Sequence, residues 1–146
     1  MKKILTLIVC LLTLHLSAEA SDDRRIEFNQ LPTQSQQWIK KHFQDQSIAL
    51  VKMESEFFYK SYEVIFTNGN KIEFDKNGNW EEIDCKYTEL PKEVVPEQIR
   101  NYVSKNYPEI KISKIEKENR NRYEVGLANG LDLKFDSRFN LIDIDN

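Results

Sequence analysis

Few residues in this chain of 146 could carry out chemistry. Nucleophilic catalysis by a thiol needs a cysteine and a histidine within hydrogen-bond reach, and a third group that orients the histidine. Beyond the first 20 residues the sequence contains one cysteine, Cys85, and one histidine, His42. His42 follows Lys41 beside the apolar stripe of a predicted helix, and Cys85 ends a predicted strand, which favours structural roles. We therefore predict that the protein is not an enzyme.

Oxygen ligands are also present, in the segment Asp75-Lys76-Asn77-Gly78-Asn79. A calcium loop of the EF-hand type has ligands at positions 1, 3 and 5, a glycine at 6 and a glutamate at 12. Here Gly78 falls at position 4, and the matching turn near the C-terminus contains Arg138 and Phe139. A hairpin turn explains the same residues. We predict neither a metal site nor a cofactor.

The elements that position these residues are indicated by a repeated pattern. Residues 62–75 read YEVIFTNGNKIEFD and residues 123–136 read YEVGLANGLDLKFD. Alternating apolar runs around Asn-Gly predict a β-hairpin in each copy. A three-residue loop, Asn68 to Asn70, keeps the apolar residues on one face and pairs Phe66 with Ile72. Gly69 and Gly130 are expected to be left-handed.

A proline and an amphipathic segment precede each copy. Pro32 and Pro96 suit helix starts, and single strands are expected on either side of each hairpin. The predicted fold is α+β, with two tandem repeats at residues 31–87 and 88–146. Each repeat is a helix plus four antiparallel strands, and together they form one curved sheet with the helices on one face. Residues 21–30 are expected to be a loose N-terminal segment.

The N-terminus carries targeting information. Lys2 and Lys3 precede an apolar run, and Ala18-Glu19-Ala20 has the form of a cleavage site, so residues 1–20 are predicted to be a signal peptide. Cleavage leaves 19 basic and 23 acidic residues, a formal charge of −4. That charge argues against nucleic acid or a membrane as partner. Cys85 is then alone, so no intrachain disulfide can form, and a monomer or weak dimer is expected.

The repeated pattern resembles the PepSY-like family of exported proteins, described as similar to β-lactamase-inhibitor proteins. The residues that carry the resemblance are the two YEV…NG…FD segments, the turn from Asp75 to Trp80, and the helix ends at Phe43 and Tyr107-Pro108. The resemblance implies two helix-plus-four-strand repeats whose open concave face can hold a protein, and a periplasmic or secreted location. PepSY-type domains are also proposed to restrain peptidases. Phe139 and Leu141 replace Gly78 and Trp80 in the second copy.

The face opposite the helices is the predicted partner-binding surface. Its expected residues are Trp80, Ile65, Glu63, Glu73, Glu82, Asp132 and Lys134. Trp80 would be an aromatic anchor in a charged rim, or it would fold over a strand end or meet the neighbouring repeat. The segment Phe57-Phe58-Tyr59 is either a second contact at a hairpin tip or buried strand. The predicted function is an exported protein-binding module that inhibits or restrains a partner enzyme. The alternative is a small-ligand or metal-binding envelope protein.

Overall fold

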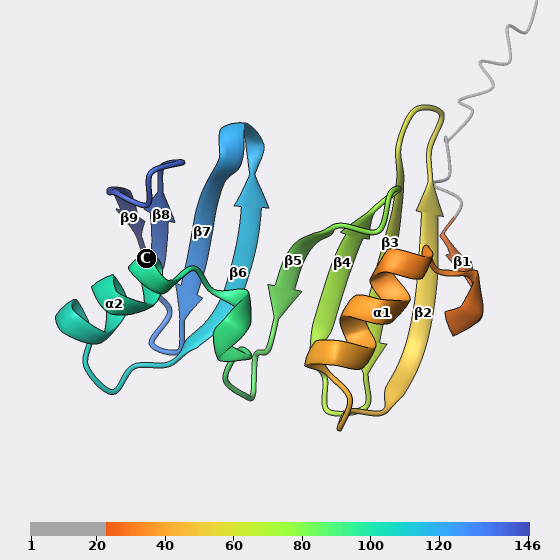
Figure 1. Cartoon of the computed structure of the whole chain (residues 1–146), viewed down its shortest axis with the longest axis horizontal. Helices are drawn as coiled ribbons and strands as arrows, with labels where there is room; N and C mark the ends of the chain where they lie inside the picture. Colours follow the sequence, from red (N-terminus) through yellow and green to blue (C-terminus); the bar gives the residue numbers. More distant parts are fainter. Residues whose placement is uncertain (1–22) are drawn as a thin grey trace, which may run out of the picture.

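The computed structural model describes residues 23–146. The predicted signal peptide and the first residues of the segment 21–30 lie outside this range. The described residues form an α+β fold with two helices and a nine-stranded antiparallel sheet (Figure 1). No helix in this range is long and apolar enough to cross a membrane.

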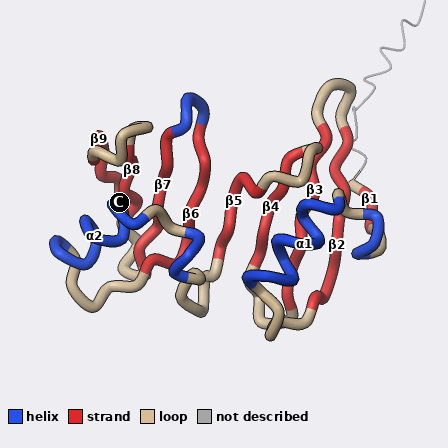
Figure 2. The backbone as a smooth tube through the Cα atoms, viewed as in Figure 1, coloured by secondary structure: helices blue, strands red, loops and turns tan. Residues whose placement is uncertain are grey.

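The strands follow one another in the sheet in the order in which they follow one another in the chain. They are β1 (Arg24–Arg25), β2 (Ile48–Ser55), β3 (Lys60–Phe66), β4 (Lys71–Asp75), β5 (Trp80–Asp84), β6 (Ile112–Glu118), β7 (Arg122–Leu127), β8 (Asp132–Phe135) and β9 (Leu141–Asp145). The helices are α1 (Thr33–His42) and α2 (Glu97–Asn106), with short 3-10 turns η1 (Phe28–Gln30), η2 (Lys92–Val94) and η3 (Asn119–Asn121). Figure 2 shows that short loops join most of the strands.

Both α-helices begin directly after a proline, whose fixed φ suits a helix start and whose missing N–H costs nothing there. They pack on the same face of the sheet (Figure 1). The Trp38 ring meets Phe74 edge-on with 6.0 Å between ring centroids, and Tyr102 meets Phe135 edge-on at 5.5 Å. The sheet therefore has one covered face and one open face.

The core is a continuous apolar row under the helices. Cross-strand pairing joins six fully buried residues from β3 to β8, namely Val64, Ile72, Ile83, Ile115, Val125 and Leu133. Burying each such side chain contributes about 1.5–3 kcal/mol. The row crosses the β5–β6 junction without a break, so α1 and α2 cover a single core.

The hairpin loops have the predicted length, but they lie one residue earlier in the chain. The β3–β4 loop is Thr67–Gly69, closed by a 2.8 Å hydrogen bond from the Phe66 N–H to the Asn70 carbonyl. Val64 thus pairs with Ile72, two residues off the predicted register. Asn70 is buried, and its amide is hydrogen-bonded to Gln46 and Thr88, which fixes it as the closing residue. A shift of two preserves the faces.

The glycine prediction is confirmed, and the expectation for the N-terminal segment is corrected. Gly69 and Gly130 have φ values of +88° and +91°. Residues 24–30 are not loose, because β1 pairs with the edge of β2 and η1 follows it. The Ile26 N–H donates to the Val51 carbonyl at 3.0 Å and the Ile26 side chain is buried, which ties this segment to the core.

Candidate protein-binding face

The open face of the sheet carries a row of glutamates, one from each of five neighbouring strands. Strand register places them side by side from β3 to β7, and we call Glu63, Glu73, Glu82, Glu116 and Glu124 the glutamate row. They share a face because each strand alternates, with the core residues one position away. Like charges directly opposite one another destabilise a sheet. The row therefore requires compensation.

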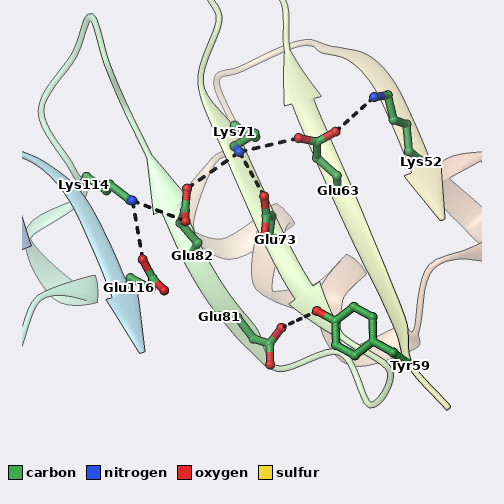
Figure 3. A network of polar contacts seen from close by, with 9 residues as sticks. All are labelled: Lys52, Tyr59, Glu63, Lys71, Glu73, Glu81, Glu82, Lys114 and Glu116. Atoms are coloured by element: carbon green, nitrogen blue, oxygen red, sulfur yellow. Dashed lines mark hydrogen bonds and ion pairs between the residues drawn. The ribbon is translucent and has the colours of Figure 1, made fainter. Parts of the chain in front are cut away.

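Lysines supply that compensation (Figure 3). Lys71 on β4 donates a hydrogen bond from its Nζ to Glu73 Oε1 at 2.9 Å. The same Nζ lies 3.6 Å from Glu63 Oε1 and 3.7 Å from Glu82 Oε1. Lys114 on β6 continues the network, with its Nζ 3.4 Å from Glu82 Oε2 and 3.5 Å from Glu116 Oε2. Each lysine thus serves two or three carboxylates.

The ends of the row are also paired. Lys52 on β2 places its Nζ 3.4 Å from Glu63 Oε2, and Lys134 on β8 lies 3.6 Å from Glu124 Oε2. Lys134 Nζ also donates to Asp145 Oδ2 at 2.7 Å. These side chains are only partly exposed, so water screens the pairs less than it screens fully solvated ones.

The pKa shifts follow from this arrangement. Burial alone would lower the pKa of Lys71, but the hydrogen bond to Glu73 and the charges of Glu73, Glu82 and Glu63 outweigh it and raise that pKa. The pKa of Lys114 is raised in the same way, because Glu82 and Glu116 outweigh burial. Burial raises the pKa of Glu124 against the lowering effect of Lys134. Lys71 and Lys114 are therefore fully charged at neutral pH.

Six of the seven predicted binding residues lie on this open face. Glu63, Glu73 and Glu82 belong to the glutamate row, and Lys134 closes one end of it. Ile65 pairs with Lys71 in the neighbouring row of the same face. Asp132 pairs with Gly126 and Asp145, at the β8 side of the face.

Trp80 is the exception, and its predicted placement is wrong. It pairs with Phe74 on the helix-covered face, partly buried, with its ring centroid 6.4 Å from that of Trp38. A register shift between Glu73 and Phe74 inserts an extra residue in β5, so that Glu82 and Trp80 do not share a face. Lys117 covers the ring, with its Nζ 3.6 Å from the centroid. The open face has no tryptophan anchor.

The signal that would have placed Trp80 was present in the sequence. Asn77-Gly78-Asn79 repeats the Asn68-Gly69-Asn70 of the preceding loop. Here too the N–H of the residue before the loop, Asp75, donates to the carbonyl of the residue after it, Asn79, at 2.8 Å. That loop pairs Phe74 with Trp80, whereas the core row pairs Ile72 with Ile83. These two pairings differ in register by one residue, and a bulge in β5 allows both. Leu141 faces the helices for the same reason, opposite Phe135.

Sequence reasoning missed the contribution of β6. Lys114 and Glu116 join the network, but Ile112 and Ile115 have opposite parity in an unbroken strand, which left the faces undecided. A register shift between Ile112 and Lys114 resolves this.

The residues considered for catalysis and for metal binding make packing contacts or turn hydrogen bonds. The His42 ring packs against Trp38 at 4.6 Å, and burial together with Lys41 lowers its pKa. Cys85 is fully buried, and burial raises the pKa of its thiol to about 11. Asp75 Oδ1 accepts from the N–H groups of Asn77 and Asn79 at 2.8 and 2.9 Å, which explains its position as a turn residue.

The Phe57-Phe58-Tyr59 segment forms the tip of the β2–β3 hairpin instead of a buried strand. Phe57 and Phe58 are 92% and 93% exposed, and their rings meet edge-on with centroids 4.7 Å apart. Tyr59 donates its hydroxyl to Glu81 Oε2 at 3.4 Å and so returns to the sheet (Figure 3). The two phenylalanines therefore form an exposed apolar surface at the hairpin tip.

Comparison with known proteins identifies relatives. Residues 60–143 match a family model described as "Putative beta-lactamase-inhibitor-like, PepSY-like". No curated protein sequence matches the chain.

Solved structures of bacterial proteins match over nearly their whole length. A protein of Bacteroides thetaiotaomicron described as a "putative calcium-regulated periplasmic protein" is 59% identical, with a TM-score of 0.83, covering 86% of this chain and 98% of its own. A "putative periplasmic protein from DUF2874 family" of Bacteroides vulgatus is 54% identical, with a TM-score of 0.82 and coverage of 87% and 99%. A second Bacteroides vulgatus protein, described as a "putative periplasmic protein of unknown function", is 36% identical, with a TM-score of 0.79 and coverage of 85% and 99%.

The resemblance that the repeated hairpins indicated is thus confirmed over more than half of the chain. The structural relatives carry the same fold and are described as periplasmic. This chain belongs to the beta-lactamase-inhibitor-like, PepSY-like family.

Proposed function

We propose that this protein is a non-enzymatic periplasmic module that binds another protein through the open face of its sheet. The observation that carries the proposal is the glutamate row. Five carboxylates lie side by side on a face that no helix covers. Lys71 and Lys114 each contact two or three of them, and Lys134 pairs with Glu124. A face used only for solubility needs no such fixed arrangement.

The charge of this face indicates the chemistry of the partner. From β3 to β8, strand alternation places nine carboxylates and four cations on it: Glu63, Glu73, Asp75, Glu82, Asp84, Glu116, Glu118, Glu124 and Asp132, with Lys71, Lys114, Arg122 and Lys134. The cations leave a surplus of negative charge. A partner whose contact surface is rich in lysine or arginine would be steered toward it and oriented on it.

Restraint of a partner enzyme is the finer form of this proposal. A sheet face this broad could cover the entrance of an active site and exclude substrate. The exposed Phe57 and Phe58 at the hairpin tip would supply apolar contact area at the edge of such an interface. The family description, with its likeness to β-lactamase inhibitors, supports this form.

The proposal includes a duplicated architecture, with units at residues 31–87 and 88–146. Its support is that α1 is followed by β2 to β5, and α2 by β6 to β9. Both loops with Gly69 and Gly130 also have the same closing hydrogen bonds. In this view the open face is built from two copies of one four-stranded surface.

The test compares two variants with the same change in charge. The face variant carries Glu73→Gln, Glu116→Gln and Glu124→Gln. The control variant carries Asp45→Asn, Glu93→Gln and Glu97→Gln, all exposed and outside the sheet. Each mature protein is immobilised, and the proteins captured from an envelope extract are compared at low and high salt.

We expect one partner to be retained by the wild type and by the control, lost by the face variant, and released by salt. Capture of the same proteins by both variants would refute binding through this face. Circular dichroism of each variant verifies that the fold is intact.

Calcium binding is a second candidate, because the relative from Bacteroides thetaiotaomicron is described as calcium-regulated. The residues present do not fit a preformed site. Within residues 23–146, no group of three or more His, Cys, Asp or Glu side chains is arranged to hold a metal ion. Millimolar calcium should therefore raise the melting temperature no more than magnesium does. A rise specific to calcium would favour this candidate.

A further inference from the structure

A cavity of about 470 Å³ lies beside α2, against the connection that follows the helix. Its apolar wall includes Leu90, Val95, Val103 and Ile112. This volume falls within the range of small-molecule pockets. The cavity belongs to the helix side of the molecule, so it is independent of the proposed protein-binding face.

Two of the residues that line the cavity differ in kind from their counterparts in the first half of the molecule. The first residue of η1 is Phe28, which packs against the core, and the first residue of η2 is Lys92. The eighth residue of α1 is Lys40, whose Nζ lies 5.7 Å from the centroid of the Phe28 ring, and the eighth residue of α2 is Ser104. An aromatic ring under a long side chain is thus replaced by a lysine and a small serine, both of which line the cavity.

Arg100 places a charge in this cavity. It is the fourth residue of α2, and its Nε donates to the Val95 carbonyl at 3.2 Å. The fourth residue of α1, Gln36, donates its Nε2 to the carbonyl of Leu31 at 2.9 Å. A neutral amide therefore suffices for this backbone contact, and arginine adds a cation that the contact does not need.

That cation has no carboxylate partner within ion-pair distance among residues 23–146. Lys92 and Lys111 also line the cavity, against Glu89 and Glu109, so its charged groups carry a positive excess. Arg100 is half-buried beside an apolar wall, and a guanidinium is suited to a planar anion, which it can bind with two parallel hydrogen bonds.

We propose that this cavity binds a small amphipathic anion, a carboxylate or sulfonate with an apolar body. The anionic group pairs with Arg100, and the apolar body lies against Leu90, Val103 and Ile112. Lys92 and Lys111 add positive charge at the cavity lining. The class therefore includes medium-chain fatty acids and aromatic acids that fit the volume.

The test uses two probes on a protein with Phe57→Ser and Phe58→Ser, so that the exposed hairpin tip does not bind them. Anilinonaphthalene sulfonate reports binding by its fluorescence, and decanoate or decanol is added as competitor. We expect saturable binding of the sulfonate, displacement by decanoate and little displacement by decanol. Binding without saturation, or displacement by both competitors alike, would overturn the proposal.

Three substitutions assign the site. Arg100→Gln retains a side chain that can reach the Val95 carbonyl, and should weaken binding at least about tenfold, or 1.4 kcal/mol. Ser104→Lys introduces the residue of α1. It adds positive charge but fills the hollow, so binding should be lost, whereas an unspecific attraction of anions would be strengthened. Lys105→Gln removes a cation of α2 that does not line the cavity and should change nothing. Equal affinities for all three variants would refute this site.

Discussion

Replacement of Trp80 by alanine tests the corrected placement of that residue. Trp80 pairs with Phe74, packs near Trp38 and lies under Lys117, all on the helix-covered face. A fully buried Trp→Ala change costs about 3–5 kcal/mol. Because Trp80 is only partly buried, we expect Trp80→Ala to lower the free energy of unfolding by about 2–3 kcal/mol.

The contact with Lys117 can be separated from the packing. A cation over an indole ring contributes about 0.5–1 kcal/mol at an exposed site. Lys117→Met should therefore destabilise by about that amount, and by much less in the background of Trp80→Ala. The difference between the two effects is the coupling energy of the pair.

Urea unfolding followed by circular dichroism measures all four proteins of this cycle. With a slope of about 1–3 kcal/mol per molar urea, the loss in Trp80→Ala moves the midpoint by about 0.7–3 M. A Trp80→Ala variant within about 0.5 kcal/mol of the wild type would refute the packing of this ring against α1. An unchanged slope would show that the denatured state is not the cause.

The remaining predictions concern a loop, a thiol and a carboxylate. Gly78 and Gly130 occupy the same loop position with φ near +90°. A Cβ added at Gly78 would lie 2.8 Å from Pro32 Cβ and from Ser35 Oγ, whereas a Cβ added at Gly130 would have no neighbouring atom within 4 Å. Gly130→Ala should cost about 1 kcal/mol of strain and Gly78→Ala about 1–3 kcal/mol more, as measured by thermal unfolding; equal costs would contradict the packing of α1 on this loop. Cys85 is buried with a raised pKa, so a thiol reagent should react with it only in denaturant, and rapid labelling of the native protein would contradict its burial. Burial would raise the pKa of Asp75, but hydrogen bonds from Asn79 and Asn77 outweigh burial and lower that pKa. The stability that ionised Asp75 contributes is therefore present above pH 3.8, the pKa in the unfolded chain. It is lost as the pH falls through the lower pKa of the folded protein. Asp75→Asn should therefore flatten the loss of stability below about pH 4 in urea titrations, and an unchanged acid limb would exclude this carboxylate as a cause.

Much of the fold could be predicted because local signals agreed with the hydrophobic pattern. Asn-Gly loops fixed the hairpins, and alternation fixed which residues of β3, β4, β7 and β8 face the core. The predicted register was wrong by two residues, but the predicted faces were still correct because side chains alternate with period two.

The failures on the open face of the sheet involve bulges. Trp80 lies on the covered face because the loop before β5 and the pairing of Ile72 with Ile83 require registers that differ by one residue. An extra residue in β5 allows both registers. A bulge in β6 likewise prevented the sequence pattern from placing Lys114 and Glu116 on the open face. A bulge depends on both strands at once, so the alternation of one strand cannot locate it.

The cavity beside α2 was outside the reach of sequence patterns as well. Phe28 and Lys92 do not look like alternatives until the chain folds and gives them equivalent places before the two helices. A volume is defined by the side chains that surround it, and those of this cavity come from α2 and from the chain just before and just after it.

The order of the strands has a consequence for how quickly the protein reaches its native state. Every strand of the sheet pairs with the strand next to it in the chain, from β1 to β9. Most pairs of strands are therefore joined by short loops. Closing such a loop takes less than a microsecond, and forming a hairpin takes a few microseconds. Only two connections, those through α1 and α2, bring together strands that are far apart in sequence. Folding rates fall as the separation between contacting residues grows, so this chain should fold rapidly for an all-antiparallel sheet. A slow step, if one occurs, should be the closing of β5 on β6, where Ile83 meets Ile115 and the two halves of the core become one.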